Sequence, residues 1–296
     1  MFTATLIAAG RLRAGDISAA ADALDQAGCA PAGWSWLDEG AAADIPFGLD
    51  PAAARAALEG GALDVVVQQL EGREKRLLVA DMDSTMIQCE CIDELADYAG
   101  LKPQIAAITE AAMRGELDFA AALDARVALL KGLDAGVIDR CLAERVRLMP
   151  GARTLVRTMR SHGTRCVLVS GGFTRFAAPV AAEIGFDRAL ANELLVANGL
   201  LTGAVTKPIV DADTKLATLR AEAAALGLDL RETLAVGDGA NDLPMIEAAK
   251  NAGGLGVAYH AKPVAAAAAG ARIEHGDLTA LLWAQGISRR EWATER

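Results

Sequence analysis

Short runs of consecutive apolar residues alternate with segments of helical periodicity along most of the chain. The apolar runs are 77–80, 166–169 and 233–236, and each ends in polar or glycine-rich residues. The segments with helical periodicity are 152–162, 174–184 and 214–226. Strands that are apolar throughout are typical of a parallel sheet with helices on both faces. The pattern therefore predicts an α/β core of three layers, with ligands at the carboxyl edge of its sheet.

Residues 91–149 lack any strand-like run. Their periodicity predicts helices over 105–114, 119–130 and 135–147, separated by glycine and aspartate. This segment follows the first core strand, so we expect a helical cap of about residues 91–149 above the sheet edge that binds ligands.

The first 74 residues differ from the rest. Strand-like runs at 3–8, 34–37 and 64–69 alternate with two helix candidates, which predicts a small α+β domain without a catalytic constellation. The charged segment 71–76 is interpreted as a linker. We therefore divide the chain into residues 1–74 and a core of residues 75–296.

Composition narrows the function classes. The chain has 296 residues, 53% hydrophobic residues and a formal net charge of −10, which excludes a wholly disordered chain and disfavours a nucleic-acid partner. The amino terminus does not resemble a signal peptide, and no apolar stretch reaches membrane-spanning length. Five unevenly spaced cysteines show no zinc spacing. We expect a cytoplasmic protein with reduced thiols and no membrane partner.

Two acidic loops follow predicted strands. Asp81 and Asp83 come directly after the first strand, and Asp238 follows the third. Carboxylates that meet at one sheet edge repel one another and suit Mg²⁺, which prefers oxygen ligands. Taken alone, each loop could equally be a helix cap or an acidic surface turn.

Two further features favour an anion at the same edge. Ser170 and Gly171 end the second strand, where a hydroxyl and unhindered backbone N–H groups can approach a phosphate. Lys215, near the start of a predicted helix, offers a positive charge. Taken separately, Ser170 could simply cap a helix start, and composition alone favours an ordinary surface lysine at 215.

The order of these motifs is more specific than any one of them. The sequence DMDST at 81–85, SGG at 170–172, the helix-start Lys215 and GDGAND at 237–242 resemble the haloacid dehalogenase superfamily of aspartate-based phosphatases. Within it, segments 81–94, 113–119 and 126–132 are similar to the phosphoserine phosphatases. The resemblance covers about residues 75–290 and implies a Rossmann-like core with a helical cap. The first 74 residues are similar in size and order to an ACT-like domain.

The resemblance also implies catalytic roles. Asp81 is expected to be the nucleophile, and Asp83 the acid and base. Asp81, the backbone carbonyl of Asp83, and Asp238 are expected to hold Mg²⁺.

Further residues are implied to bind the substrate. The phosphoryl group would contact Ser170, the N–H of Gly171, Lys215 and Asn241. Glu90 would meet the substrate ammonium and Arg126 its carboxylate, while Met113 and Phe119 would line the closed cap.

The implied reaction is Mg²⁺-dependent hydrolysis of O-phospho-L-serine to L-serine and phosphate through an aspartyl-phosphate, the last step of serine biosynthesis. One alternative is a related phosphatase or phosphotransferase acting on another small phosphomonoester. A signalling receiver domain, phosphorylated on aspartate, is a second alternative, but receivers lack the helical insertion. A homodimer is left open.

Overall fold

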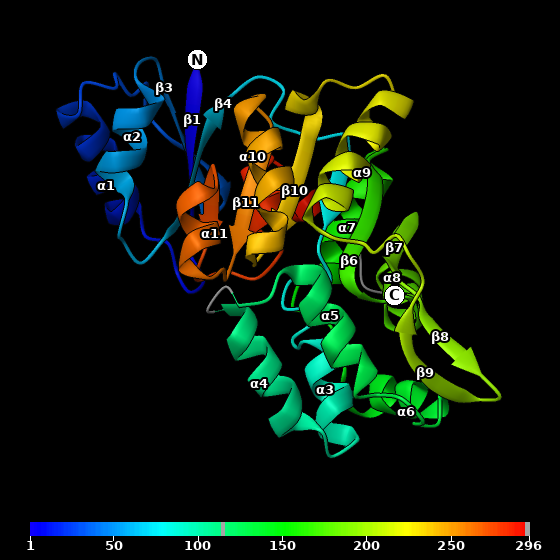
Figure 1. The fold of residues 1–296 in the computed structure, drawn as a ribbon. Coiled ribbons are helices and arrows are strands. Elements are labelled where there is room, and N and C mark those ends of the chain that lie inside the picture. Colours follow the sequence, from blue (N-terminus) through cyan, green and yellow to red (C-terminus); the bar gives the residue numbers. More distant parts are fainter. Residues whose placement is uncertain (114–115, 294–296) are drawn as a thin grey trace.

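The computed structural model describes residues 1–113 and 116–293. They form two main sheets and a helical cap (Figure 1). The first sheet is antiparallel, in the order β2-β3-β1-β4. Its strands are β1 (Phe2–Ile7), β2 (Ser35–Asp38), β3 (Ala42–Phe47) and β4 (Asp64–Gln69). Helices α1 (Ala14–Gln26) and α2 (Pro51–Leu58) pack against it around a separate apolar cluster.

The second sheet has six parallel strands in the order β12-β11-β10-β5-β6-β7. Its strands are β5 (Leu77–Ala80), β6 (Arg165–Phe173), β7 (Arg188–Asn192), β10 (Thr233–Gly237), β11 (Leu255–Tyr259) and β12 (Ala271–Ile273). Its helices are α7 (Ala152–Ser161), α8 (Thr174–Ile184), α9 (Ala212–Ala225), α10 (Leu243–Asn251), α11 (Pro263–Ala268) and α12 (Ala280–Ala284). The predicted α/β class, with a parallel sheet, is confirmed.

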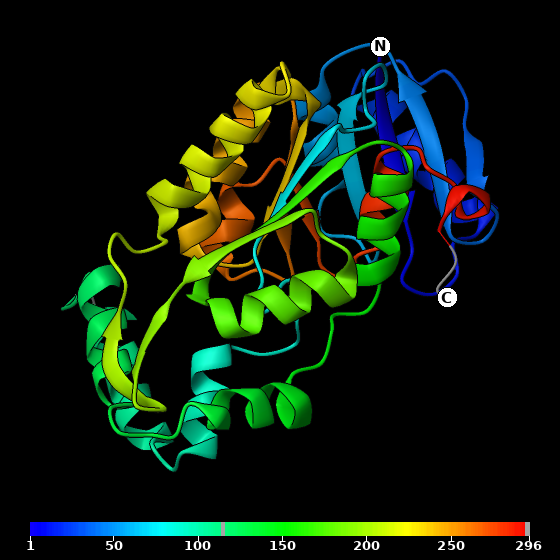
Figure 2. The same cartoon turned by 90° about the vertical axis from the view of Figure 1, so that its right-hand side faces the viewer.

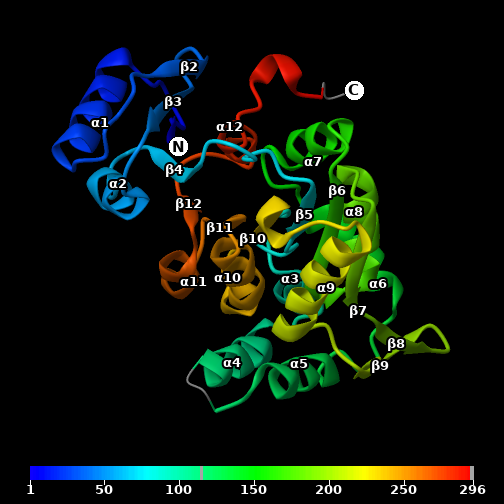
Figure 3. The same cartoon turned by 90° about the horizontal axis from the view of Figure 1, so that it is seen from above.

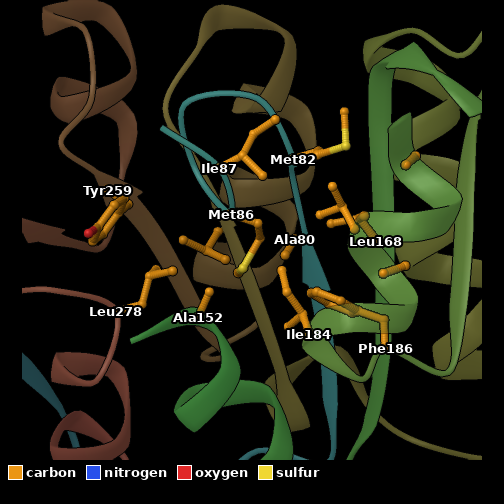
Figure 4. Close-up of a cluster of buried hydrophobic side chains, with 14 of the residues drawn as sticks. Ala80, Met82, Met86, Ile87, Ala152, Leu168, Ile184, Phe186, Tyr259 and Leu278 are labelled. Atoms are coloured by element: carbon orange, nitrogen blue, oxygen red, sulfur yellow. The ribbon is translucent and has the colours of Figure 1, made fainter. Parts of the chain in front are cut away.

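Alternation along β5 explains the layers, because successive side chains of a strand point to opposite faces. Leu78 and Ala80 join the apolar cluster that includes α7 and α8, whereas Leu77 and Val79 join the cluster with α9 and α10. Both faces are thus buried, which is why the strand reads as continuously apolar. Figure 4 shows Met82, in the loop after β5, among the side chains of the first cluster.

The cap comprises four helices beyond the carboxyl edge of the sheet: α3 (Cys91–Tyr98), α4 (Lys102–Met113), α5 (Phe119–Ala128) and α6 (Gly136–Arg145). The antiparallel hairpin of β8 (Leu194–Ala197) and β9 (Leu200–Val205) extends from the core toward it (Figure 2). Backbone hydrogen bonds join the hairpin to the α5–α6 loop: Gly132 N to Leu201 O is 2.8 Å, and Ala135 N to Gly199 O is 2.8 Å. The hairpin therefore attaches one side of the cap to the core.

The segment 71–76, interpreted above as a linker, is packed against the structure on both of its sides. Lys75 is buried, and its ammonium donates to the carbonyl oxygens of Gly72 and Arg231. Arg73 pairs with buried Asp44 at 2.7 Å. These contacts bind the segment to both sheets.

The two sheets also meet at β4 and β12 (Figure 3). The buried carboxylate of Asp64 accepts hydrogen bonds from the backbone N–H groups of Glu274, His275 and Gly276, with shortest distances of 2.7, 3.1 and 2.7 Å. Ile7 and Val66 of the first sheet belong to the main apolar cluster of the core. The first 74 residues thus share a buried interface with the core, and their status as a separate domain stays a prediction.

The interface predicts a stability effect. Asp64→Asn places an amide N–H₂ against backbone donors, so we expect the free energy of unfolding to fall by about 1–3 kcal/mol. Glu59→Gln is the control, because the Glu59–Arg272 pair nearby is exposed and such pairs contribute roughly 0–1 kcal/mol. Urea unfolding measures both. An Asp64→Asn protein as stable as wild type would contradict the proposed contribution of this interface.

Candidate active site

Three loops meet at the carboxyl edge of the parallel sheet. β10, β5 and β6 are neighbours in the sheet, so the residues that follow them lie side by side. Asp81 follows β5, Asp238 follows β10, and Ser170 and Gly171 lie in the last part of β6. Asp81, Asp238 and Ser170 are all buried.

Lys215 lies at the centre of this edge, with its side chain 0% exposed. Helix α9 begins after Asp211, whose carboxylate accepts the N–H of Thr214 and caps the helix. The Lys215 ammonium is 2.6 Å from Asp81 Oδ1 and 2.7 Å from Asp242 Oδ1. Burial lowers the pKa of Lys215, but the two carboxylates raise it more, so its net pKa lies above the usual value. The lysine is therefore a buried cation.

Asp242 ends the GDGAND motif, a loop that taken alone could have been a helix cap or a turn. Its side chain does not cap α10. Instead, Oδ2 accepts the N–H of Gly239 at 3.0 Å while Oδ1 accepts Lys215. A Cβ on Gly237 would lie 2.2 Å from Asp242 Cγ, so glycine at 237 allows this close approach. The glycine spacing in GDGAND is the signal that could have identified Asp242.

The carboxylates of this edge outnumber its cations. Burial, followed by the charge of Asp242, raises the pKa of Asp81 well above its usual range. Burial and Glu90 raise the pKa of Asp83 to about 7, and burial and Asp242 raise the pKa of Asp238 to about 6. Upward shifts of this kind arise when charged carboxylates lack water and counter-charge.

The donor set fits a divalent cation. Carboxylate oxygens of Asp81, Asp238 and Asp242 lie within 4.8 Å of one another. Both oxygens of Asp242 already accept hydrogen bonds, so Asp81 and Asp238 have the greater remaining capacity. Asp83 Oδ1 is buried without a partner among the described residues. Oxygen ligands at a site short of positive charge are what Mg²⁺ requires.

The phosphate-binding residues expected from the sequence lie together. Ser170 Oγ accepts the N–H of Gly172 at 2.9 Å, which leaves its own O–H free to donate. A Cβ on Gly171 would lie 3.9 Å from Asn241 Nδ2 and 3.0 Å from Phe119 Cζ. Phe119 of α5 therefore closes over this loop. The side chain of Met113 lies outside the described residues.

Glu90 and Arg126 bring one charge of each sign to the cap side. Ser84 Oγ donates to Glu90 Oε1 at 3.0 Å, and Glu90 does not cap α3. Arg126 Nε donates to Ala122 O at 3.1 Å. Burial lowers the pKa of Arg126, whereas the negative charges of Asp93, Glu90 and Asp83 oppose that shift.

Comparison with known proteins now identifies the family. A family model of haloacid dehalogenase-like hydrolases matches residues 78–247. A phosphoserine phosphatase of Polaromonas is 45% identical over 228 residues, which cover 75% of this chain and 95% of that protein. The chain belongs to the phosphoserine phosphatase family.

The relatives differ in the share of their own length that this chain spans. A phosphoserine phosphatase of Mycobacterium tuberculosis is 50% identical over 77% of this chain, but the chain spans only 55% of that protein. A solved haloacid dehalogenase family hydrolase of Salmonella enterica serovar Typhi superposes with a TM-score of 0.82 at 29% identity. That match covers 96% of this chain and 98% of that one, so it includes the first sheet.

The buried lysine predicts a stability effect. Lys215→Met leaves Asp81 and Asp242 without their shared cation, so we expect a loss of about 3–5 kcal/mol in the free energy of unfolding at pH 7 without added metal. Adding Asp242→Asn to this variant should recover part of that loss. Lys250→Met is the control, because its ammonium donates to Ala268 O at the exposed end of α11. Equal urea midpoints for Lys215→Met and wild type would contradict this assignment.

Proposed function

We propose that the protein hydrolyses O-phospho-L-serine to L-serine and inorganic phosphate through a phosphoryl group carried by Asp81. The observation that carries the proposal is the arrangement of charges. Asp81 is paired with a buried lysine at the sheet edge, and Glu90 and Arg126 add one anion and one cation on the cap side. That pair complements the ammonium and carboxylate of an amino acid. Family membership supports the same activity.

The nucleophile is prepared by its surroundings. Lys215 holds Oδ1 of Asp81 at 2.6 Å, so the other carboxylate oxygen can attack phosphorus. In the first step an Asp81 oxygen bonds to phosphorus as the bond from phosphorus to the serine oxygen breaks. Asp83 gives its proton to that leaving oxygen. A carboxyl group with a pKa near 7 can supply such a proton at neutral pH.

The second step returns the enzyme to its starting state. Water attacks phosphorus, Asp83 takes a proton from that water, and the bond between phosphorus and Asp81 breaks to release inorganic phosphate. Ser170, the N–H of Gly171 and Lys215 stabilise the phosphoryl oxygens in both steps. Splitting one difficult hydrolysis into two transfers is the advantage of a covalent intermediate.

Mg²⁺ would be held by Asp81, Asp238 and the carbonyl oxygen of Asp83, and when bound it supplies positive charge to the phosphoryl oxygens. Asn241, close to Gly171, would help to hold the phosphate.

Within the described residues, every helix is too short or too polar to cross a bilayer. A cytoplasmic location, a small domain over residues 1–74 and a core over 75–296 stay predictions.

Phosphate release across a small panel tests the function. Phosphoserine, phosphothreonine, phosphohomoserine and a sugar phosphate should be compared with and without Mg²⁺, and phosphoserine should be preferred. Asp81→Asn should abolish release, because an amide oxygen cannot replace the attacking carboxylate; circular dichroism checks that the variant folds. Release at the wild-type rate from Asp81→Asn would refute the nucleophile, and preference for the sugar phosphate would refute the substrate.

Arg126 should determine the preference for an amino-acid phosphate. Losing a charge-assisted contact of about 1.5–3 kcal/mol should raise KM for phosphoserine roughly 10- to 100-fold in Arg126→Ala. p-Nitrophenyl phosphate has no carboxylate, so its KM should stay nearly unchanged. Arg145→Ala, in the same cap, is the matched control because Arg145 pairs with Glu94 and Asp97 at the cap surface. Equal effects of Arg126→Ala on both substrates would remove Arg126 from substrate recognition.

A further inference from the structure

Asn192, which the proposed mechanism does not use, forms three hydrogen bonds to backbone groups through its side chain. It is the last residue of β7 and is 2% exposed. Its amide nitrogen donates to Gly171 O at 2.9 Å and to Val210 O at 3.3 Å, and its amide oxygen accepts the N–H of Val210 at 2.7 Å. Both N–H bonds and the oxygen of the side chain are therefore engaged. All three partners are backbone groups of two segments that lead to the site. One is Ser170–Gly172 in the last part of β6, called the Ser170 loop below, and the other is the loop before α9.

The first loop is the one expected to bind the phosphoryl group. The peptide between Gly171 and Gly172 is held at both sides, because its carbonyl accepts Asn192 and its N–H donates to Ser170 Oγ at 2.9 Å. A rotation of this peptide would break both hydrogen bonds. Glycines allow many backbone conformations, so a loop with two of them needs such constraints to present one arrangement.

The second loop leads into the helix that carries Lys215. Val210 directly precedes Asp211, the cap residue of α9, and the Lys215 N–H donates to Asp211 O at 3.0 Å. Asn192 binds both the N–H and the carbonyl of Val210, as a neighbouring strand would. It thereby fixes the start of α9 relative to the Ser170 loop.

We infer that Asn192 is a positioning residue for phosphoryl transfer. It holds the Ser170–Gly172 loop and the helix that carries Lys215 in the relative position that the transition state requires. This inference rests on the proposed function. The side chain of Asn192 is uncharged. It belongs to β7, whereas Glu90 and Arg126 belong to the cap. Its loss should therefore affect the phosphoryl centre and leave recognition of the amino-acid part unchanged.

Asn192→Asp is the sharpest variant, because it keeps the size and shape of the side chain. An ionised carboxylate cannot donate to Gly171 O and Val210 O, and it would place an oxygen against both carbonyls. A small displacement of positioning groups can cost on the order of 10²-fold in rate. We expect kcat to fall roughly 10- to 100-fold for phosphoserine and for p-nitrophenyl phosphate alike. Any change in KM should be of similar size for the two substrates, because recognition of the amino-acid part is left intact.

Thr164→Val is the matched control. Thr164 is buried and directly precedes β6, at the end of that strand opposite to Ser170–Gly172, and its hydroxyl donates to Lys75 O at 2.9 Å. The control thus removes a buried hydrogen bond without touching either loop, and it should leave kcat within about twofold of wild type. Asn192→Ala is the second variant, which lacks the repulsive oxygen and keeps the test available if Asn192→Asp does not fold.

Binding of inorganic phosphate in the presence of Mg²⁺, by titration calorimetry, gives a readout that does not depend on the substrate. Weaker phosphate binding in Asn192→Asp but not in Thr164→Val supports the inference. Unchanged kcat and phosphate affinity would overturn it, as would an equal fall in the control or an effect confined to KM for phosphoserine. A wild-type protein that binds phosphate but ignores phosphoserine would refute the proposed substrate alone. A wild type that binds no phosphate would overturn both.

Discussion

The ion pair between Lys215 and two carboxylates is the interaction on which the site depends. Burying the charge of a lysine side chain is unfavourable unless opposite charges compensate it. Asp81 and Asp242 provide that compensation, with carboxylate oxygens 2.6 and 2.7 Å from the Lys215 ammonium. The same pairing orients Asp81 and leaves one of its oxygens available. Asp83 and Asp238 add further negative charge, so the edge still has an excess of negative charge. An anionic substrate can bind there only if positive charge at the site offsets that excess. The net charge of −10 adds to this requirement.

The fold supplies the geometry for that correction. Parallel pairing of β10, β5 and β6 brings three loops to one edge, and the crossover into α9 places the lysine between them. The cap then closes the edge from the other side, with Phe119 against Gly171. The hairpin β8–β9 joins the cap to the core through backbone hydrogen bonds. In the proposed mechanism, substrate recognition and phosphoryl chemistry are assigned to different elements, so mutation should separate the two.

The sequence predicted the structure best where the local hydrophobic pattern follows directly from burial in the folded protein. The apolar strand 77–80 and the polar residues after it predicted the sheet and its active edge, because burial on both faces leaves a continuous apolar run. β3 and the hairpin were not predicted: β3 contains Pro46 and two alanines, which are poor strand formers. Asn192 could not be assigned from sequence, since its partners lie 18 and 21 positions away. The pairing of Asp242 with Lys215 was equally hidden, because the two residues are 27 positions apart. The local composition of the charged segment 71–76 did not show that Lys75 is buried and that Arg73 pairs with Asp44.

The most direct test of covalent catalysis at Asp81 is to locate the phosphoryl group during turnover. Protein mixed with phosphoserine and Mg²⁺, quenched in acid within the first turnover and digested, can be mapped by mass spectrometry. We predict a phosphoryl group on the peptide containing Asp81, at that aspartate, which disappears as substrate is exhausted. Rapid phosphate release with no phosphorylated Asp81 at any quench time, under conditions in which an acyl phosphate standard survives, would contradict it.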